Sequence, residues 1–562
     1  MAGSVAHLAQ YEDLPDFVSV IALSLHTSKK IADDYKAIAV LELSDMKMFI
    51  VSTKNALCSM DWFQLHDTQR RKGYILAGSA TAEQIVFEML EYGRAKGGDS
   101  VDQKSLDRRF IADVIANSQP IGIFTQMVRD AVASGASDIH IEVRGEVAVV
   151  RVRVDGVMRK TKSFPAEMML DAVSTAFTVL AEELSRTDAA FNVRLAQAAM
   201  IPIELGARRF TLRYQSHPAV GGVDVVLRIL RTSSTGGASE VRTLASLGYH
   251  PSQVEALEMA IASAWGGVFI AGITGSGKTT TLNAMLLAMA EQGGRKLISI
   301  EDPVEYVVKG VSHLSIQRTN NDSQNPFLNA MRAFLRLDPD IGMFGEIRDE
   351  LSGEIAQAAI ETGHKILTTV HATSALGIVS RLTSKMIGLD RLTVCNPEFI
   401  SALVYQVLLP RSCPECKRPA KSVMSSAELD VYERLFGLDP SGFHCASDRG
   451  CDKCRVSGVD YSEGIRQGTA GVKVAAEVVL PDEALLTLLA ARQDMEARNY
   501  CRSLRRSPFD SPDMQGKEAW GHALYDVSIG EVDPFYFQNT FGNPKSFAHC
   551  GANPGRHGVS SE

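Results

Sequence analysis

The segment Gly272–Thr279, with the sequence GITGSGKT, constrains this chain more than any other, because it matches the phosphate-binding pattern G-x-x-x-x-G-K-[ST]. A short apolar run, Gly267–Ala271, precedes it, and Thr279–Ala290 follows with apolar residues at helical spacing. Backbone N–H groups in a loop between a strand and a helix N-terminus hold phosphates well. We therefore predict a buried strand, a phosphate loop and a helix that together bind a nucleoside triphosphate.

Individual positions of this loop have distinct expected roles. Lys278 is expected to reach the β- and γ-phosphates, and the hydroxyl of Thr279 to bind Mg²⁺. The other predicted nucleotide-binding residues are Gly272, Thr274, Gly275, Ser276, Gly277 and Thr280. ATP and Mg²⁺ are thus the substrate and cofactor that this loop predicts.

Bulk composition narrows the class of protein. At 562 residues the chain is long enough for three or four domains, and its 45% hydrophobic and 22% charged content is ordinary for globular proteins. A net charge of −8 argues against a protein that coats nucleic acid or an anionic membrane, although a local basic groove stays open. We find no N-terminal secretion signal and no apolar run of about 18 residues, so we expect a cytoplasmic protein.

Periodicity and turn residues divide the chain into five predicted parts. The first is a small α/β domain, with strands at Ala37–Leu43 and Met48–Val51, a helix at Ala82–Tyr92 and a linker at Gly93–Ser100. In the third part strands alternate with helices, which is typical of a mainly parallel sheet flanked by helices. The five parts are residues 1–104, 105–235, 236–405, 406–480 and 481–562, the last being a helical region that ends in a mobile tail from residue 542.

The second part carries the alternation typical of half-buried strands. A helix is predicted at Phe124–Ser134, and Asp155-Gly156 is a turn signal that joins the strands on either side into a hairpin. The strands are predicted at Asp138–Glu142, Val149–Val154, Phe210–Tyr214 and Val223–Leu230. The polar, glycine-rich segment Thr232–Ser239 that follows is predicted to be a hinge.

Three further strands of the third part lie next to residues suited to phosphate chemistry. The strands are predicted at Leu297–Ile300, Asp340–Phe344 and Lys365–Val370. Glu305, Glu346 and His371 follow them, and His364 precedes the last. Carboxylates at the ends of parallel strands lie where ligands bind, and Glu346 is expected to orient the attacking water or to hold Mg²⁺ through water. The alternatives are a structural acid at 346 and satisfied core or interface histidines.

Together these segments resemble one known family, the type II secretion and type IV pilus assembly ATPases. Four stretches are similar to its Walker A, Asp, Walker B and His boxes: Gly272–Thr280, Ile300–Glu305, Asp338–Asp349 and Thr362–Ala375. The resemblance covers roughly residues 125–535 and implies a hexameric ring with a RecA-like P-loop core. By this resemblance Glu346 is the catalytic glutamate and Glu305 assists with metal or water. His364 and His371 would couple the nucleotide state to neighbouring elements.

The resemblance extends to the second part of the chain, which it identifies as a PAS-like α+β domain. Arg213 and Arg228 fall where that domain supplies arginines to the nucleotide pocket, and an arginine there would neutralise γ-phosphate charge in the transition state. Exposed strand arginines are the alternative. The chain also departs from the family, because Gly342 and Phe344 replace the usual branched aliphatics and Lys365 stands where an apolar residue is usual.

Two C-x-x-C pairs, Cys413-Pro-Glu-Cys416 and Cys451-Asp-Lys-Cys454, predict a structural zinc site, because four thiolates complete a tetrahedral shell with no open position. His444 or Cys445, which lie between the pairs, are substitute ligands. Free buried thiols and a redox pair are the alternatives. In the family that the chain resembles, assembly and type II secretion ATPases commonly carry this tetracysteine element and retraction ATPases lack it.

The leading hypothesis is a homohexameric ATPase that drives assembly of a type IV pilus, a plasmid-borne thin pilus or a type II pseudopilus by domain closure. The resemblance implies an inner-membrane platform protein as partner, and the first domain is expected to dock to a cytoplasmic scaffold protein. One alternative is a RecA-like motor that translocates nucleic acid, against which the net charge argues. A non-catalytic nucleotide-binding scaffold is the other, and Lys278 together with Glu346 argues against it.

Overall fold

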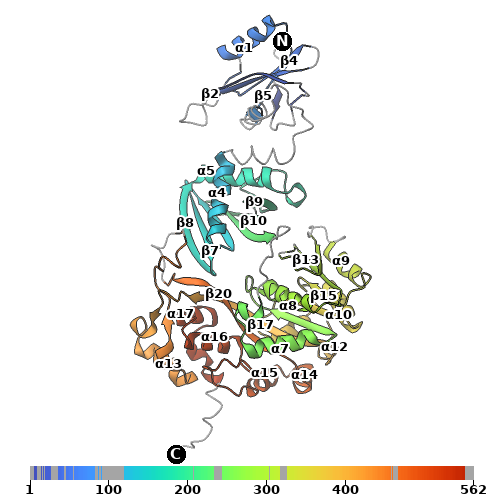
Figure 1. Cartoon of the computed structure of the whole chain (residues 1–562), viewed down its shortest axis with the longest axis vertical. Coiled ribbons are helices and arrows are strands. Elements are labelled where there is room, and N and C mark those ends of the chain that lie inside the picture. The colour runs from blue at the N-terminus through green and yellow to red at the C-terminus, as the bar shows by residue number, and fades with distance from the viewer. Residues whose placement is uncertain are drawn as a thin grey trace, which may run out of the picture. The chain divides into compact units, whose positions relative to one another are not determined.

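The computed structural model is a mixed α/β protein, as predicted (Figure 1). Its residues form two compact units. One unit consists of residues 1–127 and 168–176, and the other of residues 128–167 and 177–562. The structure describes residues 6–8, 14, 15, 17, 19–26, 36–43, 46–54, 56, 57, 59–82, 86, 87, 90, 119–206, 208–232, 243–302, 304, 306–316, 326–456, 459 and 466–550. The predicted linker at Gly93–Ser100, most of the predicted helix Ala82–Tyr92 and most of the predicted hinge Thr232–Ser239 lie outside these residues.

The first unit contains a five-stranded sheet in the order β1-β5-β4-β3-β2. Its strands are β1 (Ala6–Leu8), β2 (Ser19–His26), β3 (Lys36–Glu42), β4 (Lys47–Ser52) and β5 (Ile75–Ala82). Helix α1 (Met60–Arg71) begins after Ser59, whose hydroxyl accepts a hydrogen bond from the Trp62 N–H. Strands β3 and β4 confirm two predicted strands, whereas α1, β2 and β5 have no counterpart in the sequence-based prediction.

A six-stranded antiparallel sheet follows, in the order β8-β7-β6-β11-β10-β9. Its strands are β6 (Asp138–Arg144), β7 (Val147–Val154), β8 (Val157–Pro165), β9 (Gln197–Leu205), β10 (Arg208–Ala219) and β11 (Gly222–Thr232), with helix α4 (Gln119–Ala133) before β6 and helix α5 (Ala166–Thr175) after β8 in the sequence. The predicted hairpin is confirmed, since Val154 pairs with Val157. Asp155 and Gly156 between them both have positive φ, 53° and 77°, as a type I′ turn requires.

The phosphate-loop region is built on a seven-stranded sheet in the order β14-β13-β15-β16-β12-β17-β20. The strands are β12 (Gly266–Ala271), β13 (Leu297–Glu301), β14 (Val311–Ser315), β15 (Ile341–Phe344), β16 (Lys365–Val370), β17 (Ile400–Ser412) and β20 (Thr469–Val479). All neighbours pair parallel except β17 and β20, which are antiparallel. The mainly parallel sheet is therefore confirmed.

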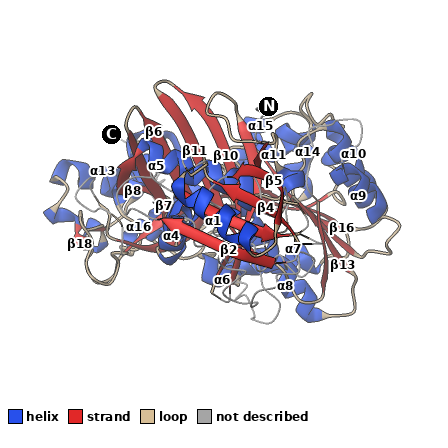
Figure 2. Cartoon of the chain, turned by 90° about the horizontal axis from the view of Figure 1, so that it is seen from above, coloured by secondary structure: helices blue, strands red, loops and turns tan. Residues whose placement is uncertain are grey.

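Helices cover both faces of this sheet because its strands are apolar on both sides. Phe269 and Ala271 of β12 pack into one hydrophobic cluster, and the alternate residues Val268 and Ile270 pack into another. Figure 2 shows α9 (Pro326–Phe334) and α10 (Glu350–Glu361) on one side of β13 and β16, with α7 (Pro251–Ala262) and α8 (Lys278–Gln292) on the other. Three short helices complete this part: α6 (Leu244–Leu247), α11 (Gly377–Leu382) and α12 (Arg391–Val394).

The sheet extends past residue 405, where the sequence suggested that the core ends. Strand β17 crosses that position, and β20 lies inside the segment 406–480 that the sequence assigns to a separate cysteine element. The remaining elements are β18 (Arg418–Pro419), α13 (Ser426–Phe436), β19 (His444–Cys445), α14 (Glu483–Ala490), α15 (Asp494–Ser503), α16 (Ala519–Ser528) and α17 (Pro534–Phe541). Part of the predicted tail is ordered as a 3₁₀ helix, Pro544–Cys550, and residues 551–562 lie outside the described part.

Two departures from the family pattern have structural reasons. Gly342 leaves room for the ring of Phe334, because a Cβ atom at 342 would come within 2.7 Å of its Cζ. Lys365 is fully buried, and its ammonium group is surrounded by oxygens: Ser263 Oγ at 2.6 Å, Ser401 Oγ at 2.7 Å, Trp265 O at 3.1 Å and Ala260 O. Burial lowers the pKa of Lys365 to about 7.

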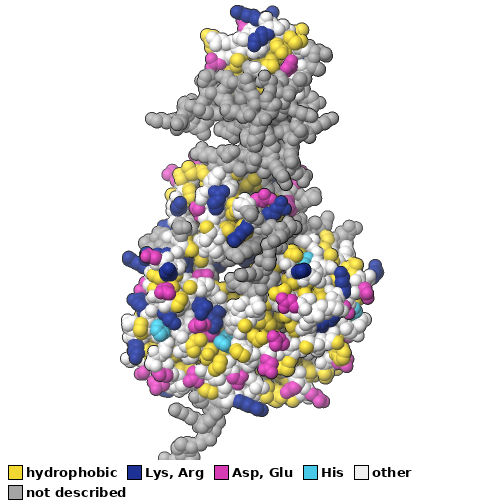
Figure 3. Space-filling view, viewed as in Figure 1, with side chains coloured by type: hydrophobic (Ala, Val, Ile, Leu, Met, Phe, Trp, Pro, Cys, Tyr) yellow, Lys and Arg dark blue, Asp and Glu magenta, His cyan; other side chains and the backbone are white. Residues whose placement is uncertain are grey.

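Charges of both signs are interspersed over the described part of the face that Figure 3 shows, without a large field of one sign. Within the described ranges, no helix combines the length and the apolar character that a membrane span needs.

Candidate functional site

The phosphate loop lies between β12 and α8, as predicted, and its glycines are sterically required. Gly275 and Gly277 have φ of 79° and 81°, a region that favours glycine, and Gly277 is the residue that caps α8. A Cβ atom on Gly272 would lie only 2.3 Å from the backbone oxygen of Gln406. Among the other loop residues, Thr274 is exposed and Ser276 is buried, while Thr279 and Thr280 are half-buried in the first turn of α8.

Lys278 folds back over the loop that carries it. Its Nζ donates to the carbonyl oxygens of Gly272 at 2.9 Å and Ile273 at 3.1 Å. Burial lowers the pKa of Lys278, and the negative charge of Glu346 opposes that shift. The lysine of the loop and the glutamate that follows β15 are therefore close enough to interact electrostatically.

Glu346 is held by two cationic or protonatable neighbours. Its Oε1 lies 3.1 Å from His371 Nε2, and its Oε2 accepts a hydrogen bond of 2.7 Å from Arg348 Nε. The backbone here is fixed to the adjacent strand, because Thr369 Oγ1 donates to Gly345 O at 2.7 Å. The structure thus brings together three predicted residues, Lys278, Glu346 and His371, and adds Arg348. The sequence alone could have indicated Arg348, because it is a basic residue two positions after the acid that follows a strand.

His364 is the exception among the predicted site residues described. It precedes β16 whereas His371 follows it, so at about 3.3 Å per residue the two lie roughly 20 Å apart, at opposite ends of the strand. His364 Nδ1 lies 3.0 Å from both Ala359 O and Thr362 Oγ1 at the end of α10, and its ring contacts Phe334. These contacts match the alternative of a satisfied structural histidine, because the strand itself separates His364 from the phosphate loop.

Glu305 lies outside the described residues, but another acid at the end of β13 is described. Glu301 is buried, and its Oε1 accepts a hydrogen bond from Ser299 Oγ at 2.7 Å and lies 3.4 Å from His313 Nδ1. Its Oε2 is buried and has no hydrogen-bond partner within the described part of the chain. Glu301 is thus a further carboxylate at the strand edge where Glu346 lies.

The two predicted arginines lie together on the antiparallel sheet. Arg213 of β10 is directly opposite Arg228 of β11, and Arg228 Nε donates to Asp138 Oδ1 at 2.9 Å. Arg153 Nε lies 4.0 Å from the second oxygen of the same carboxylate. Asp138 is almost fully buried, so it anchors Arg228, while Arg213 is exposed.

The four cysteines of the C-x-x-C pairs converge, with their sulfur atoms within 4.8 Å of one another. The separations are 3.9 Å for Cys413–Cys451, 3.7 Å for Cys416–Cys454 and 3.8 Å for Cys451–Cys454. A tetrahedral ion with metal–sulfur distances of about 2.3 Å requires sulfur–sulfur distances of about 3.8 Å. The donor set therefore fits one Zn²⁺. His444 and Cys445 are not in this cluster: His444 Nδ1 lies 2.8 Å from Gly442 O, and Cys445 packs in a hydrophobic cluster.

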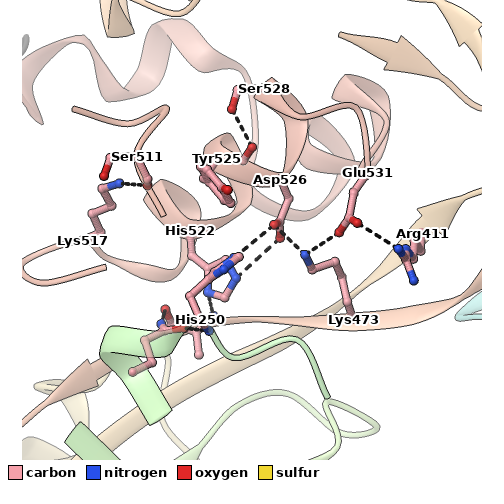
Figure 4. A network of polar contacts seen from close by, with 12 residues as sticks. His250, Arg411, Lys473, Ser511, Lys517, His522, Tyr525, Asp526, Ser528 and Glu531 are labelled. Carbon is pink, nitrogen blue, oxygen red and sulfur yellow. Dashed lines mark hydrogen bonds and ion pairs between the residues drawn. The ribbon is translucent and has the colours of Figure 1, made fainter. Parts of the chain in front are cut away.

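A second cluster has the residue types of a metal site, but its hydrogen bonds and ion pairs are those of a structural network (Figure 4). It contains His250, His522 and Asp526, and Lys473 donates to Asp526 Oδ1 at 2.7 Å. His522 Nδ1 accepts the Ala476 N–H at 3.0 Å, so its proton is on Nε2, which faces Asp526. Because an ammonium group and an N–H occupy the ligand positions, this cluster is an internal salt bridge that ties α16 to β20.

A parallel sheet whose edge carries a phosphate loop, a loop lysine and a strand-end glutamate defines a P-loop ATPase, and this chain is an enzyme of that class. Residues 116–507 match the family described as Type II/IV secretion system protein. The chain belongs to this family, since the match covers more than half of its length.

The relatives named in this family act in secretion and pilus assembly. Type II secretion system protein E of Pseudomonas aeruginosa is 32% identical over 378 residues, which are 64% of this chain and 69% of that protein. Type II secretion system ATPase E of Vibrio cholerae is 30% identical over 67% of this chain and 69% of its own length. Type IV pilus assembly ATPase PilB of Thermus thermophilus is 28% identical over 77% of this chain and 46% of that protein. The chain is thus similar, over about two thirds of its length or more, to proteins named for type II secretion and for pilus assembly.

Proposed function

We propose that this chain is the motor that powers a type IV pilus, a plasmid-borne thin pilus or a type II secretion pseudopilus, as a homohexamer at the cytoplasmic face of an inner membrane. An integral-membrane platform protein turns its movement into pilin extraction, and the first domain, residues 1–104, docks to a cytoplasmic scaffold protein. The relatives named for type II secretion and for pilus assembly support this proposal. The core is RecA-like and the second domain, with its antiparallel sheet, PAS-like.

The observation that carries the catalytic part of the proposal is that the phosphate loop after β12, Glu346 after β15 and His371 after β16 all lie at the same edge of the parallel sheet. Lys278 contacts the β- and γ-phosphates, and its partial burial strengthens that contact, because charges interact more strongly away from water. The Thr279 hydroxyl would hold Mg²⁺, which would supply neutralisation of the phosphate charge. Glu346 orients the attacking water, and His371 and Arg348 fix the direction of its carboxylate. Glu305 assists with metal or water.

Domain closure completes the site in this proposal. Arg213 and Arg228 are adjacent cations on neighbouring strands, which makes them a paired source of positive charge for the γ-phosphate. Closure of the second domain over the core, through the segment 232–239, brings the exposed Arg213 to the nucleotide. Around a ring, successive closures and openings become the deformation that moves the platform.

The cysteine cluster supports an assembly motor rather than a retraction motor. The sulfur–sulfur distances near 3.8 Å fit Zn²⁺ held by Cys413, Cys416, Cys451 and Cys454. Four thiolates leave no position for substrate, so the ion is structural. It joins two loops that are 34 residues apart in the sequence.

ATP turnover by the purified chain tests the site. Lys278→Ala is expected to abolish hydrolysis, and Glu346→Gln to retain bound ATP while hydrolysis falls by at least ~100-fold, as for other groups that act in the transition state. Glu350→Gln is the matched control, because Glu350 is an exposed acid four positions later. Wild-type turnover in both site variants would refute the assignment. Hydrolysis stimulated by DNA would favour a nucleic-acid motor instead.

A further inference from the structure

Gln406 is a fully buried polar residue in an otherwise apolar stretch of β17. β17 pairs with β12, and Ala271 at the end of β12 is opposite Tyr405. Gln406 therefore lies directly beneath the phosphate loop that begins at Gly272. A buried amide that lacked partners would cost about 1–3 kcal/mol, so the bonds that Gln406 makes explain why a polar residue is tolerated there.

The amide of Gln406 is held in one orientation. Its Oε1 accepts hydrogen bonds from Tyr249 OH at 2.7 Å and from Thr281 Oγ1 at 3.0 Å. Burial raises the pKa of Tyr249, so the phenol stays protonated and remains a donor. With both donors on the oxygen, the Nε2 group must face the other way, and it donates to Ser276 O at 2.7 Å.

This bond determines the direction of one loop amide. A trans peptide is planar, with its C=O and N–H pointing in opposite directions. Because the Ser276 carbonyl is bonded to Gln406 inside the core, the Gly277 N–H that shares its peptide unit points away from the core. Gly277 itself has a positive φ of 81° and caps the N-terminus of helix α8, and the N-terminal amides of this helix hold phosphate in loops of this pattern.

We propose that Gln406 is a positioning residue for the ATPase reaction: by holding the Ser276 carbonyl, it keeps the Gly277 N–H aimed at the nucleotide phosphates. It does not touch the nucleotide and acts through the loop. The inference rests on the proposed phosphate-binding role of residues 272–279. Tyr249 and Thr281 contribute by preventing the amide of Gln406 from rotating.

The test removes the bond to the loop in two ways. Gln406→Leu and Gln406→Met both lack a donor for Ser276 O, and both keep a side chain of similar size in the core. We expect Kd for Mg·ADP to rise by at least ~5-fold in both variants, as the loss of about 1 kcal/mol predicts. KM for ATP should rise in parallel, with kcat changed less than ~3-fold, because an interaction common to ground and transition states is lost. Tyr432→Phe, which removes a fully buried phenol oxygen that bonds Gln538 and not Gln406, is the control and should change Kd by less than ~2-fold.

An unchanged Kd for Mg·ADP in both folded Gln406 variants, with a lowered thermal midpoint only, would overturn the proposal and leave Gln406 a core residue. If neither variant folds, the double variant Tyr249→Phe/Thr281→Val frees the amide to rotate and should itself raise Kd by at least ~3-fold; an unchanged Kd there also overturns it. Lys278→Ala distinguishes failure of the phosphate-binding assignment from failure of the role proposed for Gln406. If it binds Mg·ADP as wild type does, the phosphate-binding assignment has failed, and not the role of Gln406 alone.

Discussion

The stability of the core should rise with pH because of Lys365. The side chain is fully buried at the start of β16, where its Nζ bonds carbonyl and hydroxyl oxygens and, within the described part of the chain, no carboxylate. Its folded-state pKa is about 7, whereas an unfolded lysine titrates near 10.4. Below pH 7 the lysine is protonated in both states, and the cost of burying its charge is fully present. Above pH 7 the folded state loses its proton first, so unfolding takes up a proton and stability increases until the unfolded lysine also titrates.

The size of this effect follows from the two pKa values. Between them, the free energy of unfolding changes by about 1.4 kcal/mol per pH unit. From pH 7 to pH 9 the gain is about 2 kcal/mol, since the slope is only half developed at the folded-state pKa. Lys365→Met removes the titrating group and restores the apolar character that the family usually has here. The wild-type chain should therefore gain about 2 kcal/mol relative to this variant over that interval.

Native-state hydrogen exchange, corrected for intrinsic rates, measures this difference as the opening free energy of peptides from β12 and β16. Peptides from the first unit serve as an internal control. Lys385→Met, at an exposed lysine of the same core, is the matched variant and should show no pH-dependent difference from wild type. If Lys365→Met and wild type gain stability equally between pH 7 and pH 9, the pKa of Lys365 in the folded state is not lowered by burial.

Two further predictions concern the C-terminal part. Cys451→Ser should reduce bound zinc, measured by elemental analysis, from one ion per chain to well below half an ion per chain. A wild-type chain that contains no zinc after expression in zinc-supplemented medium would contradict the proposed site. Lys473→Met should lower the free energy of opening of β20 by about 3–5 kcal/mol, because it leaves the fully buried Asp526 without its cation. The double variant Lys473→Met/Asp526→Asn should recover part of that loss. If it recovers none, the burial of an unpaired charge is not the cause.

The parts of the site that the sequence predicts are those formed by residues close together in the chain. The order of strand, glycine-rich loop and helix around Lys278 depends on neighbours in the chain, so the pattern alone places it. Glu346 and His371 were predictable because each follows an apolar strand, and parallel strands end at one edge. The same rule places His364 at the opposite edge, since it comes before its strand. The prediction that His364 belongs to the site follows instead from the similarity of Thr362–Ala375 to the His box of the family.

The rest depended on contacts between distant segments. β20 pairs antiparallel with β17 although the cysteine element separates them, and no periodicity in either strand identifies the other as partner. Gln406 and Lys365 are visible in the sequence as polar residues within apolar strands. Their partners, such as Tyr249 for Gln406 and Ser401 for Lys365, come from elements whose position the sequence does not define.

The late return of β20 to the sheet has a consequence for biosynthesis. β17 carries Gln406 and flanks β12, yet one of its edges stays open until the chain has been made as far as Val479. The ion pairs of Lys473 with Asp526 and Glu531 form later still. A nascent chain that already displays its whole phosphate loop therefore lacks the strand that closes the sheet. The core domain therefore completes its fold only once the chain has been made as far as Glu531, and until β20 pairs with β17 the open edge is a surface that chaperones can recognise.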